Sequence, residues 1–121
     1  MKTGVAALLV FALAVPVAHG HEFTDRYIPI GQSPGVSGTP QSMIGSIQAV
    51  SAQARSLTMS VDGGQRTVTV TDRTRIWIDR SRSAQTNLRG GIADLQSGRR
   101  AEVKYDDKNK ALAEWIKVEA P

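Results

Sequence analysis

Residues Thr67–Arg80 read TVTVTDRTRIWIDR, and this stretch decides the fold class. Alternation of apolar and polar residues with a period of two is typical of a β-strand with one buried and one solvated face. The alternation loses its apolar member at Asp72–Arg73, so we expect a bend there, or two short strands in place of one. The even positions are predicted to enter the core, and they are Val68, Val70, Ile76 and Ile78.

The odd positions of the same stretch predict a functional surface. They place Arg73, Arg75 and Trp77 in a row on the solvated face. Arginine binds carboxylates and phosphates through paired hydrogen bonds, and an adjacent indole stacks on a ring or a cation. We therefore predict a ligand-binding surface of Arg73, Arg75 and Trp77, helped by Tyr27 from the N-terminal arm. The alternative is a solubilising face whose arginines pair with carboxylates at Asp72, Asp79 or Glu102.

Further alternating segments lie on both sides of this stretch. Asp62–Gly63 is a strong hairpin signal, because such a turn needs positive φ. Ile92–Gln96, closed by Gly98, suits one or two helical turns. A slip of phase near Glu114–Trp115 predicts a β-bulge. The other expected strands contain Ile47 and Ala49, Leu57–Val61, Ala101–Tyr105 and Leu112–Val118.

This order of elements predicts an all-β fold. We expect a small five- to six-stranded OB-like barrel with a short helix between strands 3 and 4. A small open sandwich is the competing architecture. Tyr105 and Trp115 are single aromatic residues, and we expect them to cover the open end of the barrel in a structural role.

The N-terminus carries the features of a secretory signal peptide. Met1–Lys2 is positive, Val5–Val17 is almost entirely apolar, and Ala18–Gly20 offers small residues for cleavage. The apolar run is shorter than the roughly 20 residues that span a membrane. The sequence thus predicts a signal peptide over residues 1–20, an extended arm over 21–44 and the barrel domain over 45–121. The mature chain is expected in the periplasm or secreted, without a transmembrane segment.

Composition narrows the expected partners. The 121 residues carry a net charge of +4 and contain no cysteine, which excludes disulfides and thiol chemistry. Nucleic acid is not expected as a partner of an exported protein. A basic surface outside the cytoplasm instead points to an anionic glycan, a lipid headgroup or an acidic protein surface.

Catalysis and cofactor binding find little basis in the sequence. Beyond His19 and His21 no histidine is present, and no glycine-rich phosphate loop occurs. The α-amine and imidazole of His21 could chelate Cu(II) at a cleaved terminus, and Met43 could offer a thioether to Cu(I). Met59 is in phase with Leu57 and is expected in the core. We predict no enzyme, no cofactor and no metal site, and leave open whether His21 or Met43 binds metal.

The series GSIQAV, SLTMSV, TVTVTDRTRI, DLQSGRRAEVKY and AEWIKV carries a family resemblance over Gly45–Val118. It resembles small exported bacterial OB-like domains, many of them in families of unknown function. It is also distantly similar to the periplasmic copper- and silver-binding metallochaperone of a cation efflux system. That family binds metal through a His, two Met and a stacking Trp. This chain has no His after His21 and no Met-x-Met pair between Asp62 and Thr71, so those ligands are not transferred.

The leading prediction is a non-enzymatic exported module for binding or protein interaction. Metal binding, which the resemblance implies, and an accessory subunit of an envelope complex are the alternatives.

Overall fold

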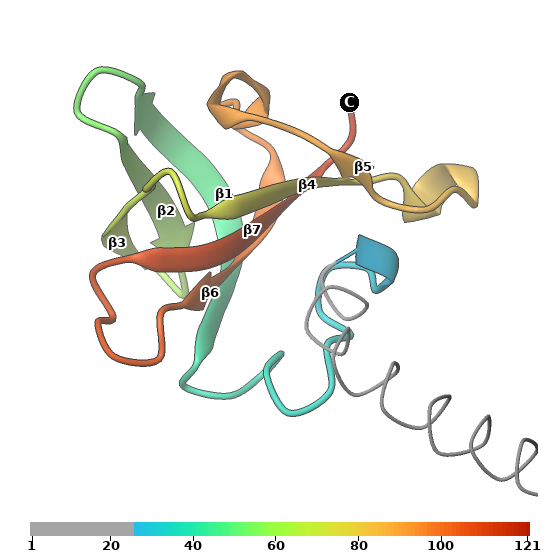
Figure 1. Cartoon of the computed structure of the whole chain (residues 1–121), viewed down its shortest axis with the longest axis horizontal. Helices are drawn as coiled ribbons and strands as arrows, with labels where there is room; N and C mark the ends of the chain where they lie inside the picture. The colour runs from blue at the N-terminus through green and yellow to red at the C-terminus, as the bar shows by residue number, and fades with distance from the viewer. Residues whose placement is uncertain (1–25) are drawn as a thin grey trace, which may run out of the picture.

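The computed structural model describes residues 26–121, which form one curled, mixed β-sheet (Figure 1). The all-β prediction is confirmed, but five to six strands were too few. The two-residue strand β5 is too short to leave an alternating pattern in the sequence. The strands are β1 (Ser42–Ser51), β2 (Ser56–Val61), β3 (Gly64–Thr69), β4 (Arg75–Asp79), β5 (Leu88–Arg89), β6 (Arg100–Tyr105) and β7 (Ala113–Glu119).

The sheet order is β3-β2-β1-β6-β7-β4-β5, and β4 runs parallel to β7 while the other neighbours are antiparallel. Strand β1 serves two partners, since it pairs with β6 over Ser42–Ser46 and with β2 over Ser46–Ser51. A register shift between Ile47 and Ala49 bends it further. The sheet curls so far that Thr69, at the end of β3, forms a parallel bridge with Leu112 just before β7.

The stretch Thr67–Arg80 contributes to two short strands, which was one of the two predictions made for it; the other was a single bent strand. Strand β3 ends at Thr69 and β4 begins at Arg75. Between them the Thr74 N–H donates to the Thr71 carbonyl at 3.1 Å and closes a turn. The buried Thr74 Oγ1 also donates to the carbonyl of Ala113 at 2.7 Å, which ties this turn to β7.

The core fills the inside of the curl. Val68, Val70 and Ile76 are buried as predicted, whereas Ile78 is only partly buried. Met59 is fully buried, as expected, and Met43 is only 3% exposed. Met43 lies in β1, which begins at Ser42, before the predicted start of the barrel domain at Gly45.

Local predictions hold where neighbouring residues decide them. Asp62 and Gly63 have φ of 49° and 79°, as the hairpin requires. Lys104 pairs with Trp115 and Tyr105 with Ala113, so Glu114 is the extra residue of the predicted bulge.

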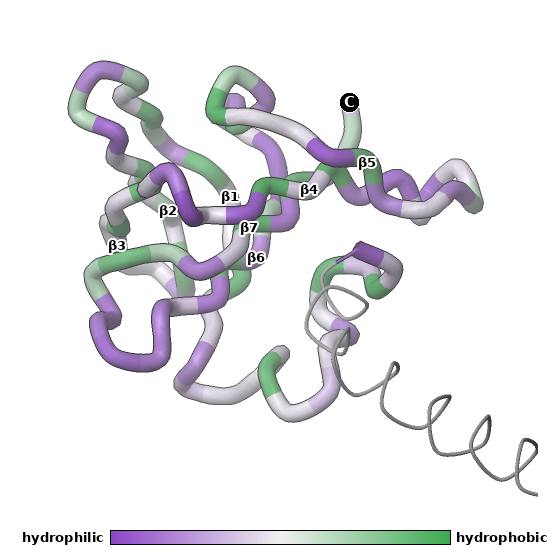
Figure 2. The backbone as a smooth tube through the Cα atoms, in the orientation of Figure 1, coloured by the Kyte–Doolittle hydropathy of each residue, from purple (hydrophilic) through white to green (hydrophobic). Residues whose placement is uncertain are grey.

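The predicted helix is only a single 3-10 turn, η2, over Ile92–Asp94. It ends there because Leu95 takes an extended backbone and turns its side chain into the core, where it is 4% exposed. A second 3-10 turn, η1 (Ser81–Ser83), was not predicted. Figure 2 shows hydrophilic positions gathered in connecting loops such as the one between β6 and β7.

The described part of the arm lies beside the sheet and is bonded to the outward face of β4, β6 and β7 (Figure 1). The N–H groups of Ile30 and Gly31 donate to the carboxylates of Asp79 and Glu102, each at 2.8 Å. The buried Lys117 ammonium donates to the Ser33 hydroxyl at 2.9 Å. Over the described residues, these bonds dock the arm on the sheet.

The signal peptide predicted for residues 1–20 and the candidate metal ligand His21 lie outside the described residues. Within residues 26–121, no helix is long and apolar enough to cross a membrane.

Asp79 makes the docking of the arm sensitive to acid. Burial alone would raise its pKa, but hydrogen bonds from Ile30 and Ser81, helped by the charge of Lys117, hold the pKa below the ordinary 3.8. The ionised carboxylate therefore stabilises the fold above pH 3.8, and this contribution is lost as the pH falls through the lowered pKa. We expect Asp79→Asn to lower the free energy of unfolding by about 1–2 kcal/mol at pH 7.

Urea unfolding of both proteins between pH 2 and pH 7 measures this effect. The difference between wild type and Asp79→Asn is expected to shrink below pH 3.8, where the wild-type carboxyl takes up its proton. A difference that stays constant over that range would contradict the role given to the Asp79 carboxylate.

Candidate functional site

The predicted surface of Arg73, Arg75 and Trp77 is divided by the structure. Arg73 is exposed in the turn before β4, and Arg75 is partly buried with its guanidinium 3.4 Å from the Glu114 carboxylate. Trp77 is only 5% exposed, so the expectation that it stands on a solvated face was wrong. The unpredicted strand β5 contributes to this burial, since Arg89 pairs with Trp77 and places its guanidinium 5.2 Å from the indole ring, and the arm docks on the same face at Asp79.

Tyr27 lies away from Arg73. It is 45% exposed, and its ring is 5.4 Å from the Arg26 guanidinium. The arm here contacts the far end of β4, because Ile30 is bonded to Asp79, whereas Arg73 precedes the start of that strand. The structure thus brings Arg75 and Trp77 to one face of β4 and leaves Tyr27 apart from Arg73. The ligand-binding role of all four residues stays a prediction.

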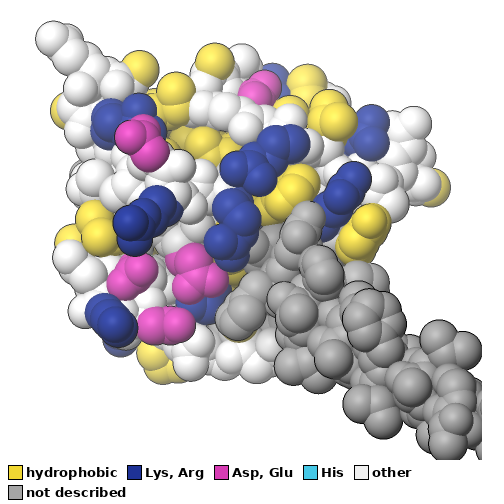
Figure 3. Space-filling model, viewed as in Figure 1, with side chains coloured by type: hydrophobic (Ala, Val, Ile, Leu, Met, Phe, Trp, Pro, Cys, Tyr) yellow, Lys and Arg dark blue, Asp and Glu magenta, His cyan; other side chains and the backbone are white. Residues whose placement is uncertain are grey.

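Charges around Arg73 and Arg75 are balanced by acids. The two residues line a depression of about 560 Å³ together with three carboxylates, those of Asp72, Asp106 and Glu114. Lys and Arg side chains spread over the face that carries β4, β5 and β7 (Figure 3), but several are already paired. Arg82 lies 3.1 Å from Glu119, and Arg55 lies 3.4 Å from Asp72. These pairs agree with the alternative of a solubilising, ion-paired face, and of the acids expected there Asp72 is paired, with Arg55.

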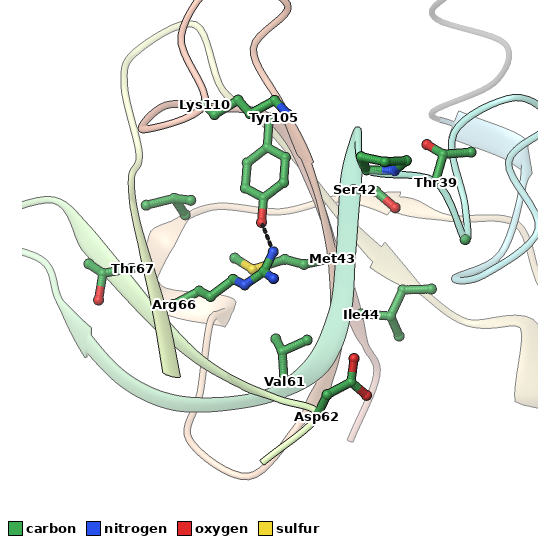
Figure 4. A pocket seen from close by; sticks show the side chains of 13 residues that line it. Thr39, Ser42, Met43, Ile44, Val61, Asp62, Arg66, Thr67, Tyr105 and Lys110 are labelled. Carbon is green, nitrogen blue, oxygen red and sulfur yellow. Dashed lines mark hydrogen bonds between the residues drawn. The ribbon is translucent and has the colours of Figure 1, made fainter. Parts of the chain in front are cut away.

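A larger hollow of about 850 Å³ lies at one end of the curled sheet (Figure 4). Strand β1, the β2–β3 hairpin and the end of β6 surround it, and the last residues of the arm form one wall. Its lining is about equally polar and apolar, with mostly buried side chains at the floor and charged groups at the rim. The floor comprises Met43, Val61, Val68 and Tyr105, and the charged rim comprises Asp62, Arg66 and Lys110.

Strand periodicity explains why these side chains meet. Arg66 shares the inward face of β3 with the buried Val68, because residues two apart in a strand point the same way. Tyr105 is likewise in phase with the buried Val103 of β6, and Met43 is the β1 partner of Val103. The hollow is thus the end of the core, where inward-facing positions reach the surface.

Arg66 is held at the rim by one hydrogen bond. Its Nη1 donates to the Tyr105 hydroxyl at 3.2 Å (Figure 4). This hydrogen bond, together with the charge interaction with Tyr105, raises the pKa of the Arg66 guanidinium above its ordinary value. Within residues 26–121, neither Arg66 nor Lys110 takes part in an ion pair. The rim can therefore receive an anionic group while the floor receives an apolar one.

One feature of the sequence indicates this site, namely a charged residue in phase with core positions. Arg66 immediately precedes the stretch Thr67–Arg80 and is in phase with its core positions, so a charged residue stood on the predicted core face. Lys110 and Met43 left no such signal. Each lies in a segment interpreted as a connection or as the arm.

Fold and site together define a small all-β protein with a ligand-sized hollow at the end of a curled mixed sheet. No protein-family model matches the chain, and no curated protein matches it either. Two solved structures are similar, each with a TM-score of 0.44. One is silver-bound CusF, with 14% identity over 64% of this chain and 93% of that one. The other is a Cu(II)-bound tryptophan-to-alanine variant of CusF from Escherichia coli, with 15% identity over 69% of this chain and 98% of that one. At this level of similarity, neither structure assigns a site or a ligand to this chain.

Proposed function

We propose that this chain is a non-enzymatic binding module acting outside the cytoplasm. Its hollow would accept a ligand that carries an anionic group next to an apolar body. The observation that carries this proposal is Arg66, held by Tyr105 at the rim of a hollow with a mixed polar and apolar lining, without an ion-pair partner among the described residues. Ligand sites commonly combine an apolar lining with a few oriented polar groups, and guanidinium–carboxylate bonds are among the stronger ones.

The architecture supports this proposal. We infer that the curled sheet is a partly open OB-type barrel, because β4 pairs in parallel with β7 and the Thr69–Leu112 bridge links β3 to the start of β7. The mouth of a β-barrel is a frequent place for a ligand. The hollow then lies at the mouth of this barrel.

The predicted signal peptide supports an extracytoplasmic setting for the module. Anionic glycans, lipid headgroups and acidic protein surfaces were the expected partners there. A glycan has little apolar surface, whereas the floor formed by Met43, Val61 and Val68 favours a ligand with an apolar part.

Arg66→Ala is expected to weaken the binding of 4-phenylbutyrate, a probe with a carboxylate and an apolar ring, by roughly 10- to 100-fold. The reason is the loss of a charge-assisted hydrogen bond worth about 1.5–3 kcal/mol. Titration followed by NMR chemical shifts measures the affinity, with the largest shifts expected at Met43 and Tyr105. The neutral analogue 4-phenylbutanol is expected to bind wild type more weakly than the carboxylate.

Arg73→Ala is the matched control, because it removes the same exposed charge outside the hollow. It is expected to leave the affinity unchanged. Weaker binding by Arg73→Ala together with unchanged binding by Arg66→Ala would reject the hollow and favour the surface of Arg73, Arg75 and Trp77. Thermal melting of both variants checks that each is folded.

The metal-binding alternative stays a prediction. Within residues 26–121 no group of three or more His, Cys, Asp or Glu side chains is arranged to hold a metal ion. Met43 lines the hollow, but Met59 is fully buried among apolar side chains, so the described residues do not assemble the His, Met and Trp set of the metallochaperone. Calorimetry with Ag(I) and Cu(II) tests the alternative. Heat at micromolar protein that disappears in Met43→Leu would favour it.

A further inference from the structure

Strand β3 has an open edge. It is the last strand in the sheet order and pairs with β2 through a two-residue hairpin at Asp62–Gly63. In such a hairpin the residues that flank the turn form a hydrogen-bonded pair, so the backbone groups of Gly64, Arg66 and Val68 face β2. The backbone groups of Gln65, Thr67 and Thr69 then face away from the sheet.

The observed hydrogen bonds of β3 agree with this assignment of inward-facing and outward-facing backbone groups. The outward N–H of Thr69 donates to the Ala111 carbonyl at 2.8 Å. The described part of the chain offers no such partner to the outward backbone of Gln65 or Thr67. An edge with unpaired N–H and C=O groups is a template for another extended chain.

The open edge borders the hollow. Thr67 lines it from β3, and Lys110 lines it from the loop between β6 and β7. Beyond the Thr69–Leu112 bridge, the two segments separate with the hollow between them. A chain lying along β3 would therefore continue the pairing that Thr69 begins.

Charge decides which chain fits. The rim presents the cations of Arg66 and Lys110 against the single carboxylate of Asp62. A second copy of β3, with the sequence GQRTVT, would bring another Arg66 and no acid. Like charges opposed across strands are destabilising, which disfavours a dimer through this edge. An acidic segment matches the rim.

We propose that the hollow binds an extended acidic peptide segment, which adds as a strand to the open edge of β3. This inference rests on the proposed function and names the ligand class of the same site. An acidic residue lies opposite Arg66, on the inward face. An apolar residue two positions away lies opposite Gly64, next to Val61 of the hollow, because Ala111 and Leu112 already occupy the place beside Val68 and Thr69.

The first test uses the wild-type chain and two fluorescent, end-capped peptides. They are Ser-Ser-Val-Ser-Glu-Ser-Ser and its reverse, Ser-Ser-Glu-Ser-Val-Ser-Ser, which cover the parallel and the antiparallel direction, respectively. One of them is expected to bind by fluorescence anisotropy, and replacing its Glu by Lys is expected to weaken binding at least about tenfold. N-methylation of each residue in turn should weaken binding about 3- to 10-fold at alternate positions only, because only alternate amides of an edge strand reach its partner. A scan without this period of two rejects strand addition.

The second test uses Thr67→Pro, which removes the outward N–H of β3 at a position that donates nothing to β2. It is expected to abolish peptide binding, and circular dichroism checks that the variant is folded. If the variant does not fold, the N-methyl scan on wild type decides alone.

The two proposals fail differently. Binding of 4-phenylbutyrate that depends on Arg66, together with no peptide binding or a flat N-methyl scan, keeps the anion site and rejects strand addition. If Arg66→Ala changes neither affinity, the proposed function is rejected as well. A concentration-dependent dimer in sedimentation that Thr67→Pro removes would replace the peptide by a second copy of this chain.

Discussion

Gly45→Ala is expected to lower the free energy of unfolding by about 3 kcal/mol or more, because the added methyl group has no room. A Cβ at this position would collide with the Ser60 carbonyl oxygen and lie 3.1 Å from a methyl carbon of Val61. Gly45 lies where β1 passes from its partner β6 to its partner β2, so relief of the clash would require separating β1 from β2. Backbone atoms cannot rotate away as a flexible side chain can.

Thermal melting measures this loss, and a decrease in Tm of roughly 10–20 °C is expected for a domain of this size. Gly91→Ala is the matched control. Its Cβ would have no atom within 4 Å, and Gly91 has an extended backbone with φ of −140° that any residue can adopt. Equal melting temperatures for wild type and Gly45→Ala would contradict the close approach of β1 to Ser60.

Glu102→Ala is expected to destabilise the chain by about 3–5 kcal/mol, the range found when one member of a buried charged network is removed. Glu102 is fully buried in β6 and accepts hydrogen bonds from the Gly31 N–H at 2.8 Å and from the Ser37 hydroxyl at 2.7 Å. Alanine would leave both donors without this acceptor. It would also remove a negative charge directly opposite the fully buried Lys117 in the β6–β7 register.

Urea unfolding measures the loss, and hydrogen exchange at the Gly31 amide reports the contact itself. The amide is expected to lose protection in Glu102→Ala. Glu119→Ala is the matched control, since its ion pair reaches the solvent through Arg82, whose side chain is 78% exposed, and solvent-accessible pairs contribute about 1 kcal/mol or less. A similar cost for the two variants, with Gly31 still protected, would contradict the role of Glu102 in docking the arm.

These two predictions concern positions that a periodicity argument treats as ordinary. Gly45 was only the start of a strand pattern, and Glu102 was only one of the carboxylates considered as partners for surface arginines. Their importance comes from what other segments bring to them. Ser60 approaches Gly45 from β2, and the arm lies over Glu102 from a position 71 residues earlier.

The candidate site shows the same difference between what local periodicity predicts and what distant segments decide. Trp77 has the strand phase that alternation predicts, on the face of Arg75 and Asp79, but a strand face is wet only where nothing covers it. The two-residue strand β5 places Arg89 over the indole, and no short-range pattern announces a strand of that length. The predicted surface was therefore correct in phase and wrong in exposure.

The sequence by itself determined the local features: the strand periods that bury Val68, Val70 and Ile76, the Asp62–Gly63 hairpin and the bulge at Glu114. Each depends on the conformational preferences of neighbouring residues. Only the tertiary structure decided which strand faces are covered, and that Arg66 meets Tyr105 across 39 residues of chain at the rim of the hollow. The physical reason is that burial and charge pairing depend on which distant segments meet, and periodicity carries no information about that.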